Sequence, residues 1–141
     1  MKNLTYTLLI ALLLFVAIPG YSLAGDQPDV AAIVAAETFT ETLDKGDFTG
    51  AWQQTSAANQ SYAKQRPDWY IKILAIRPLL GKAIDRSLEK LSRHSSWVGL
   101  PDGDYLRVSF TTTFQNKKDS LETVVLVREK GIWVVSSYHL R

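Results

Sequence analysis

The 141-residue sequence contains no cysteine and only two histidines, His94 and His139. Without cysteine the chain has no disulfide, no thiol nucleophile and no residue that could carry a lipid at a cleavage site. A zinc site usually takes three or four nitrogen, sulfur or oxygen ligands, so the histidines would need carboxylates to complete one. We therefore interpret both histidines as surface residues and predict neither a metal nor another cofactor.

The sequence is also poor in net charge and in recognised motifs. The formal net charge is +2, and lysine and arginine are scattered without a basic stripe, which argues against nucleic acid as a partner. There is no glycine-rich phosphate loop, no Gly-x-Ser-x-Gly elbow and no histidine pair at metal spacing. Nothing in the sequence therefore indicates a particular reaction.

Residues 1–24 have the features of a secretory signal peptide. Lys2 supplies a positive start, residues 8–18 are an apolar run, and Ser22-Leu23-Ala24 is a small-x-small cleavage site. Because the run is short for a bilayer span, we predict cleavage near Ala24-Gly25, a periplasmic or secreted product, and no stable membrane anchor afterwards. An uncleaved N-terminal anchor is the alternative. Removal of Lys2 lowers the formal net charge to +1.

Residues 25–141 are predicted to form a single α+β domain whose C-terminal third is the most regular part. Apolar and polar residues alternate there with a period of two, which is typical of half-buried strands. We predict strands over residues 105–115, 121–128 and 132–140. The turn-forming residues between them are few, so the three strands should be sequential antiparallel neighbours.

The N-terminal half is predicted to be helical and to cover this sheet. Apolar residues at helical spacing predict a long first helix that Asp29 caps and Gly46 ends. Asp47 is the N-cap candidate of a short second helix, and residues 57–66 are interpreted as a polar connector. Asp68 is expected to cap a third helix, whose apolar side carries Trp69, Ile73, Ile76 and Leu80.

Periodicity does not decide the structure of residues 82–96. Ile84, Leu88 and Leu91 fit helical spacing, whereas Ile84, Arg86 and Leu88 fit the alternation of a strand equally well. We predict a first strand, because Gly81 already ends a helix and a three-stranded sheet would leave its apolar centre poorly flanked. The expected fold is therefore a curved four-stranded antiparallel sheet packed by helices, of the NTF2-like or cystatin-like kind, an analogy that carries no function.

Charged residues on apolar faces are the main chemical signal. Arg77 follows Trp69 and Ile73 on the inward side of the third predicted helix, while Arg86 and Glu122 lie on apolar strand faces. A buried unpaired charge costs several kcal/mol, so each needs a partner. The favoured interpretation is an internal arginine–glutamate pair. The alternative is a pocket whose arginines hold an anionic ligand, and Tyr138 could serve either.

These residues belong to an ordered set that resembles a known family. The set comprises residues 43–48, Trp52, Ser56, Trp69, residues 77–81, Arg86, residues 101–105, 110–114, 122–123 and 131–133, and Tyr138. It is similar to the secreted bacterial family called domain of unknown function 4019, over nearly all of the chain beyond the signal peptide. The resemblance implies export and a small single-domain fold. It implies no activity, and it places Arg77, Arg86, Glu122 and Tyr138 on positions of the family pattern.

Two function hypotheses follow. The first is a non-enzymatic periplasmic binding or protein-interaction module, whose partner is a protein or a small anionic ligand. The second is a small-pocket enzyme with Glu122 as general base and with Tyr138 and the arginines as donors, although adjacent arginines would lower the pKa that a base needs. Homodimerisation would cover an exposed strand edge, but the sequence does not show whether the chain dimerises.

Overall fold

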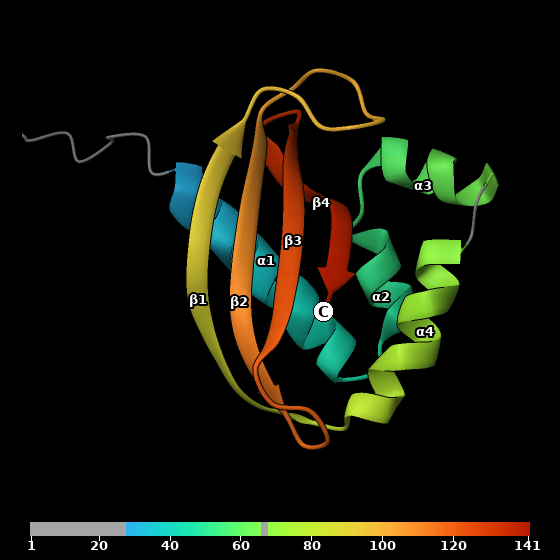
Figure 1. The fold of residues 1–141 in the computed structure, drawn as a ribbon. Helices are drawn as coiled ribbons and strands as arrows, with labels where there is room; N and C mark the ends of the chain where they lie inside the picture. The colour runs from blue at the N-terminus through green and yellow to red at the C-terminus, as the bar shows by residue number, and fades with distance from the viewer. Residues whose placement is uncertain (1–27, 66–67) are drawn as a thin grey trace, which may run out of the picture.

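The computed structural model describes residues 28–65 and 68–141 (Figure 1). The predicted signal peptide and its cleavage site lie outside these residues. The described chain runs through helices α1 (Pro28–Asp44), α2 (Phe48–Gln53), α3 (Ala57–Gln65) and α4 (Asp68–Leu80), and then through strands β1 (Ala83–His94), β2 (Tyr105–Phe114), β3 (Ser120–Glu129) and β4 (Ile132–Leu140). None of the helices in these two ranges has the length and apolar character needed to cross a membrane.

The four strands form one antiparallel sheet in the order β1-β2-β3-β4, so every strand pairs with its neighbour in sequence. The prediction of an α+β fold with a four-stranded sheet is confirmed, and the ambiguous stretch from residue 82 is a strand. Register shifts in β1, between Ala83 and Asp85 and between Leu88 and Lys90, are typical of bulges, which bend and twist an edge strand.

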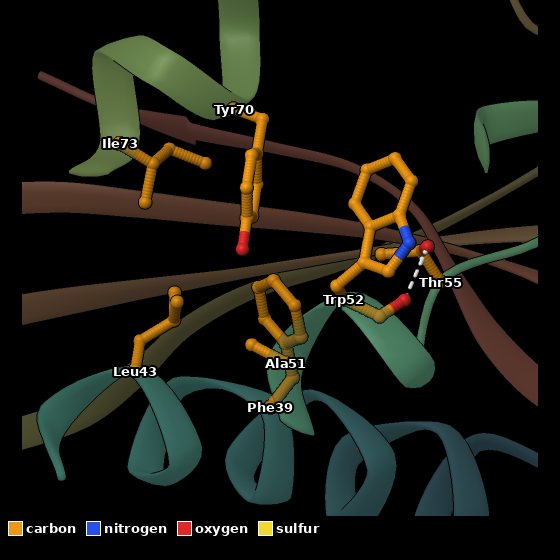
Figure 2. Close-up of a pocket in the computed structure, with 7 residues that line it drawn as sticks. All are labelled: Phe39, Leu43, Ala51, Trp52, Thr55, Tyr70 and Ile73. Carbon is orange, nitrogen blue, oxygen red and sulfur yellow. Dashed lines mark hydrogen bonds between the residues drawn. The ribbon is translucent and has the colours of Figure 1, made fainter. Parts of the chain in front are cut away.

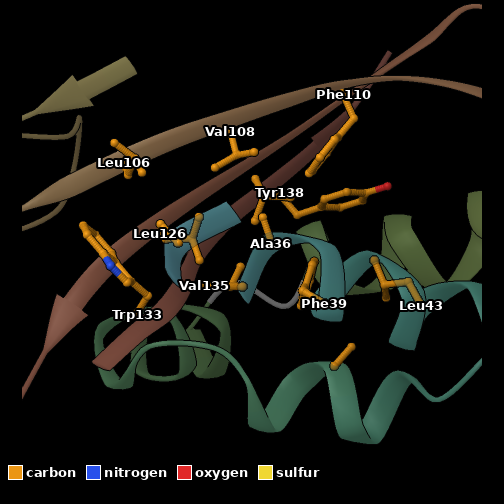
Figure 3. Packing of buried hydrophobic residues seen from close by; sticks show 13 residues of the cluster. Ala36, Phe39, Leu43, Leu106, Val108, Phe110, Leu126, Trp133, Val135 and Tyr138 are labelled. Atoms are coloured by element: carbon orange, nitrogen blue, oxygen red, sulfur yellow. The ribbon is translucent and has the colours of Figure 1, made fainter. Parts of the chain in front are cut away.

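Helix α1 crosses one face of the sheet and provides most of the cover, whereas α2 and α4 lie beyond β4 (Figure 1). Helix α1 packs against β2, β3 and β4. Phe39 and Leu43 point from α1 toward the apolar side chains of the sheet (Figure 3). The ring of Phe39 meets that of Tyr138 edge-on, with 5.6 Å between the ring centroids. The alternating pattern of the C-terminal strands thus has its apolar partner in the first helix.

Local signals set the helix boundaries, with two differences from the prediction. Gly46 ends α1 with a φ of +74°, and the Asp47 carboxylate caps α2 by accepting a hydrogen bond of 2.8 Å from the Gly50 amide, as expected. The polar connector predicted over residues 57–66 is wrong, because α3 occupies most of it and Ser56 caps that helix through the Asn59 amide. Helix α1 begins at Pro28 instead of after an Asp29 cap, since proline suits the first turn.

Three apolar residues predicted to face inward are exposed instead. Ile76 lies on the solvent side of α4, because the buried side of that helix is formed by Ile73, Arg77 and Leu80. Ile84 and Leu88 are exposed on β1, since this strand is an edge strand and α1 packs against the other three. Strand β1 therefore has little apolar cover, which makes the partner of Arg86 important.

Candidate functional site

The structure brings all four predicted site residues into one place. Arg77 comes from α4, Arg86 from β1, Glu122 from β3 and Tyr138 from β4, and their polar atoms meet at the end of α1. We use the term charged cluster for these four residues together with two that the sequence analysis did not select, namely Asp44 and Thr112. The cluster thus joins α1 and α4 to all four strands.

Glu122 is the centre of the charged cluster and is 0% exposed. Its Oε2 atom accepts hydrogen bonds from Arg86 Nε at 2.7 Å and from Thr112 Oγ1 at 2.5 Å. Its Oε1 atom accepts one from the Tyr138 hydroxyl at 2.6 Å, and Arg77 Nη1 lies 3.4 Å away. Both carboxylate oxygens are therefore occupied by protein donors.

Asp44, the last residue of α1, supplies the second carboxylate. It accepts hydrogen bonds from Arg86 Nη1 at 2.8 Å and Nη2 at 3.2 Å, and another from Arg77 Nη2. An anion at a helix C-terminus is opposed by the helix dipole, so the two guanidinium groups offset an unfavourable position. With Asp44 included, two arginines face two carboxylates and the formal charges cancel.

Arg77 is the more deeply buried of the two arginines. Its guanidinium carbon lies 4.6 Å from the centroid of the Phe114 ring, in cation–π geometry. Its Nη2 atom also approaches the Thr40 carbonyl oxygen at 3.4 Å, while the buried Nε atom makes no hydrogen bond with any described residue. The Arg77 side chain thus connects α4 to the last turns of α1, at Thr40 and Asp44, and to Phe114 of the sheet.

The surroundings of Tyr138 and Arg86 raise the pKa of both side chains, so both stay protonated. Burial, and then the neighbouring charge of Glu122, raise the pKa of Tyr138 well above its ordinary value. Burial alone would lower the pKa of Arg86, but the hydrogen bond to Asp44 and the charge of Glu122 raise it above the ordinary value. Neither side chain is suited to give up a proton near neutral pH.

The hollows near the cluster are a small internal cavity and an open surface groove. An apolar cavity of about 10 Å³ lies between α1, α2 and α4 (Figure 2), lined by Phe39, Leu43, Ala51, Trp52, Thr55, Tyr70 and Ile73. A cavity of this size holds one water at most. On the surface beside Asp44 there is an open groove of about 310 Å³, whose charged residues are two acids and two lysines, Glu41, Asp44, Lys45 and Lys82.

The histidines take no part in the cluster. His94 lies at the end of β1, where its Nε2 atom is 3.0 Å from Ser92 Oγ and its ring meets that of Trp97 edge-on. His139 is exposed on β4, and its pKa is lowered by partial burial and then by Arg141 and Arg107. Within residues 28–65 and 68–141, no three histidine or acidic side chains are grouped as a metal site would require.

Comparison with solved structures identifies the fold class. A crystal structure of a Campylobacter jejuni protein, provisionally described as an NTF2-like transpeptidase, matches 79% of this chain and 98% of its own chain. The TM-score is 0.52 and the sequence identity is 16%, so the likeness supports an NTF2-like α+β fold and carries no activity with it.

Comparison with family models identifies the family. Residues 35–138 match the model of the family described as protein of unknown function (DUF4019), and the chain belongs to that family. No curated protein matches the sequence significantly. The matched residues contain the whole charged cluster, from Asp44 to Tyr138.

Proposed function

We propose that the protein is an exported, non-enzymatic module that binds a protein partner through its surface, while the charged cluster holds the fold together. The observation that carries this proposal is the saturation of Glu122. Both of its oxygens already accept hydrogen bonds from side chains of the same chain, and the residue is inaccessible to solvent.

The enzymatic alternative fits this arrangement poorly. A general base must reach the proton that it removes, and its pKa should lie near the working pH. Glu122 is paired with Arg86 and lies close to Arg77, so the charge of its carboxylate is already engaged by cations of the same chain. A substrate would also have to displace Tyr138 or Thr112 before it could contact the carboxylate.

The anion-pocket alternative is also less well supported than the structural role. A bidentate arginine fork recognises a carboxylate or a phosphate. In this protein the fork of Arg86 faces Asp44, and Arg77 shares the same carboxylate. The chain thus provides its own anions, and an external ligand would have to compete with covalently tethered ones.

Export is supported by the sequence of the first 24 residues, with their positive start, apolar run and small-x-small site. The test is native mass spectrometry of the full chain, expressed with its own leader in the bacterial source and purified from the exported fraction. We expect a polypeptide that begins at Gly25 and carries no additional small-molecule mass. A precursor that remains in the cytoplasm would overturn the export part of the proposal.

The same spectrum tests the binding part. A small molecule retained at one copy per chain would contradict the proposal, and its loss in Arg86→Leu but not in Arg93→Leu would locate it at the charged cluster. Crosslinking in intact cells should give discrete species that contain the chain and another protein. Crosslinked species that contain only this chain, or none at all, would argue against a partner protein.

A further inference from the structure

Helix α4 presents an apolar face to solvent. Ile71 is 55% exposed and Leu79 is 72% exposed, and both lie within α4. Six residues from 71 to 79 are exposed, and five of them are apolar, namely Ile71, Ala75, Ile76, Pro78 and Leu79. A surface helix normally has one apolar face and one polar face, and an exposed apolar face marks an interaction surface.

The opposite face of the same helix is already fixed to the protein. Ile73 packs against the core, Arg77 is bound to Asp44, and Tyr70 donates a hydrogen bond of 3.2 Å to the Phe48 carbonyl oxygen. Helix α4 lies on the side of the molecule opposite β1 (Figure 1). Its exposed apolar face is therefore carried by a helix that is fixed to the core, and the residues of that face are not members of the charged cluster.

We propose that this face binds the same face of a second copy of the chain, with the two α4 helices antiparallel about a two-fold axis at Ala75. Ile71 and Leu79 lie one turn before and one turn after Ala75, on one stripe of the helix. The two-fold axis brings Ile71 opposite the partner's Leu79 and Ala75 opposite the partner's Ala75. The small alanine side chains allow the helix axes to approach closely at the crossing point.

The charges favour a second copy in this orientation. Lys72 is the one charged residue among the six exposed positions, and the axis places it beside the last turn of the partner helix. A cation is favourable there because of the helix dipole. A parallel pair would instead place Lys72 beside the partner's Lys72.

The absence of cysteine allows a direct test. Ala75→Cys, in the chain from residue 25 onward, would introduce a single thiol at the proposed axis. Mild oxidation should convert most of this variant into a covalent dimer, because a disulfide requires Cα atoms closer than about 7 Å. Val98→Cys is the control, since Val98 is 97% exposed in the loop between β1 and β2. We expect the control to crosslink at least ten-fold more slowly at the same protein concentration.

Sedimentation equilibrium supplies the second readout. We expect the wild-type chain to dimerise and Leu79→Lys to raise the dimer dissociation constant about 100-fold or more, because it buries unpaired cations near the partner's Lys72. Val98→Lys should leave that constant unchanged. A wild-type chain that remains monomeric at millimolar concentration would overturn the proposal. A dimer that is insensitive to Leu79→Lys and not crosslinked by Ala75→Cys would overturn it equally. These outcomes are independent of the proposed function, which concerns a different protein partner.

Discussion

Replacing Arg86 by leucine is the most informative single change in the charged cluster. The guanidinium group of Arg86 donates three hydrogen bonds, one to Glu122 and two to Asp44. After Arg86→Leu, two carboxylates would share one arginine, and the fully buried Glu122 would keep only Arg77 as a nearby cation. Removing one member of a buried ion pair costs about 3–5 kcal/mol, because the remaining charge is left uncompensated.

This loss is large compared with the stability of a domain of this size, which is about 5–15 kcal/mol. For a domain slightly larger than 100 residues, each kcal/mol lowers the melting temperature by about 4 °C. We therefore expect Arg86→Leu to melt about 12–20 °C below the wild type, unless it fails to fold. Urea denaturation followed by circular dichroism would give the free energy of unfolding itself.

Arg93→Leu is the matched control, since it makes the same substitution on the same strand. The Arg93 side chain is 45% exposed and its Nη1 atom lies 2.6 Å from Asp104 Oδ1. A surface ion pair contributes about 1 kcal/mol or less, so this variant should remain close to the wild type. Equal losses in the two variants would refute the reasoning. A stable Arg86→Leu variant that has lost a bound molecule would instead assign the cluster to ligand binding.

Two further predictions concern pH and backbone conformation. The pKa of Tyr138 is raised in the folded state, so its contribution to stability is complete below about pH 10 and is lost as the pH rises further. In Tyr138→Phe the free energy of unfolding should therefore decrease less steeply with pH in the alkaline range than it does in the wild type. Tyr105, whose pKa burial also raises, should contribute part of the remaining slope, and a slope that Tyr138→Phe leaves unchanged would contradict this assignment. Gly81→Ala should destabilise more than Gly99→Ala in thermal melts, since both glycines have positive φ but only at position 81 would the new Cβ lie 2.8 Å from Gln115 Cβ. Equal losses would show that φ alone decides the cost.

The sequence predicted the sheet and most of the charged cluster because each signal lies within one element. A charge on an apolar face is visible from the period of that strand or helix, as for Arg77 and Glu122. Asp44 has no such signal, because it lies at a helix end among other polar residues. It could have been inferred from charge balance, since two inward arginines and one glutamate leave one positive charge without a partner.

The errors also have local causes. Helix α3 has no apolar stripe in its sequence, and its Ser56 cap has no acidic residue three positions later to make the start recognisable. Ile84 and Leu88 were expected to face the core, because alternation indicates one face of a strand but not whether a helix covers that face. Burial at a sheet edge depends on the path of α1, which no local pattern specifies.

The exposed positions of β1 explain why this edge strand is joined to α1 and β3 by charged side chains and not by apolar ones. A strand register is well specified when one face is buried, and β1 buries little apolar surface on its inner face. Arg86 provides a directional alternative, because only one register brings its Nε atom to Glu122 and its Nη atoms to Asp44. A slip of one residue would turn Arg86 to the outer face and leave two carboxylates with one arginine. A buried ion pair adds little net stability compared with well-packed apolar residues, yet breaking one is costly. We therefore infer that the cluster fixes the position of the edge strand against α1, and that its contribution lies more in selecting this arrangement than in the total free energy of folding.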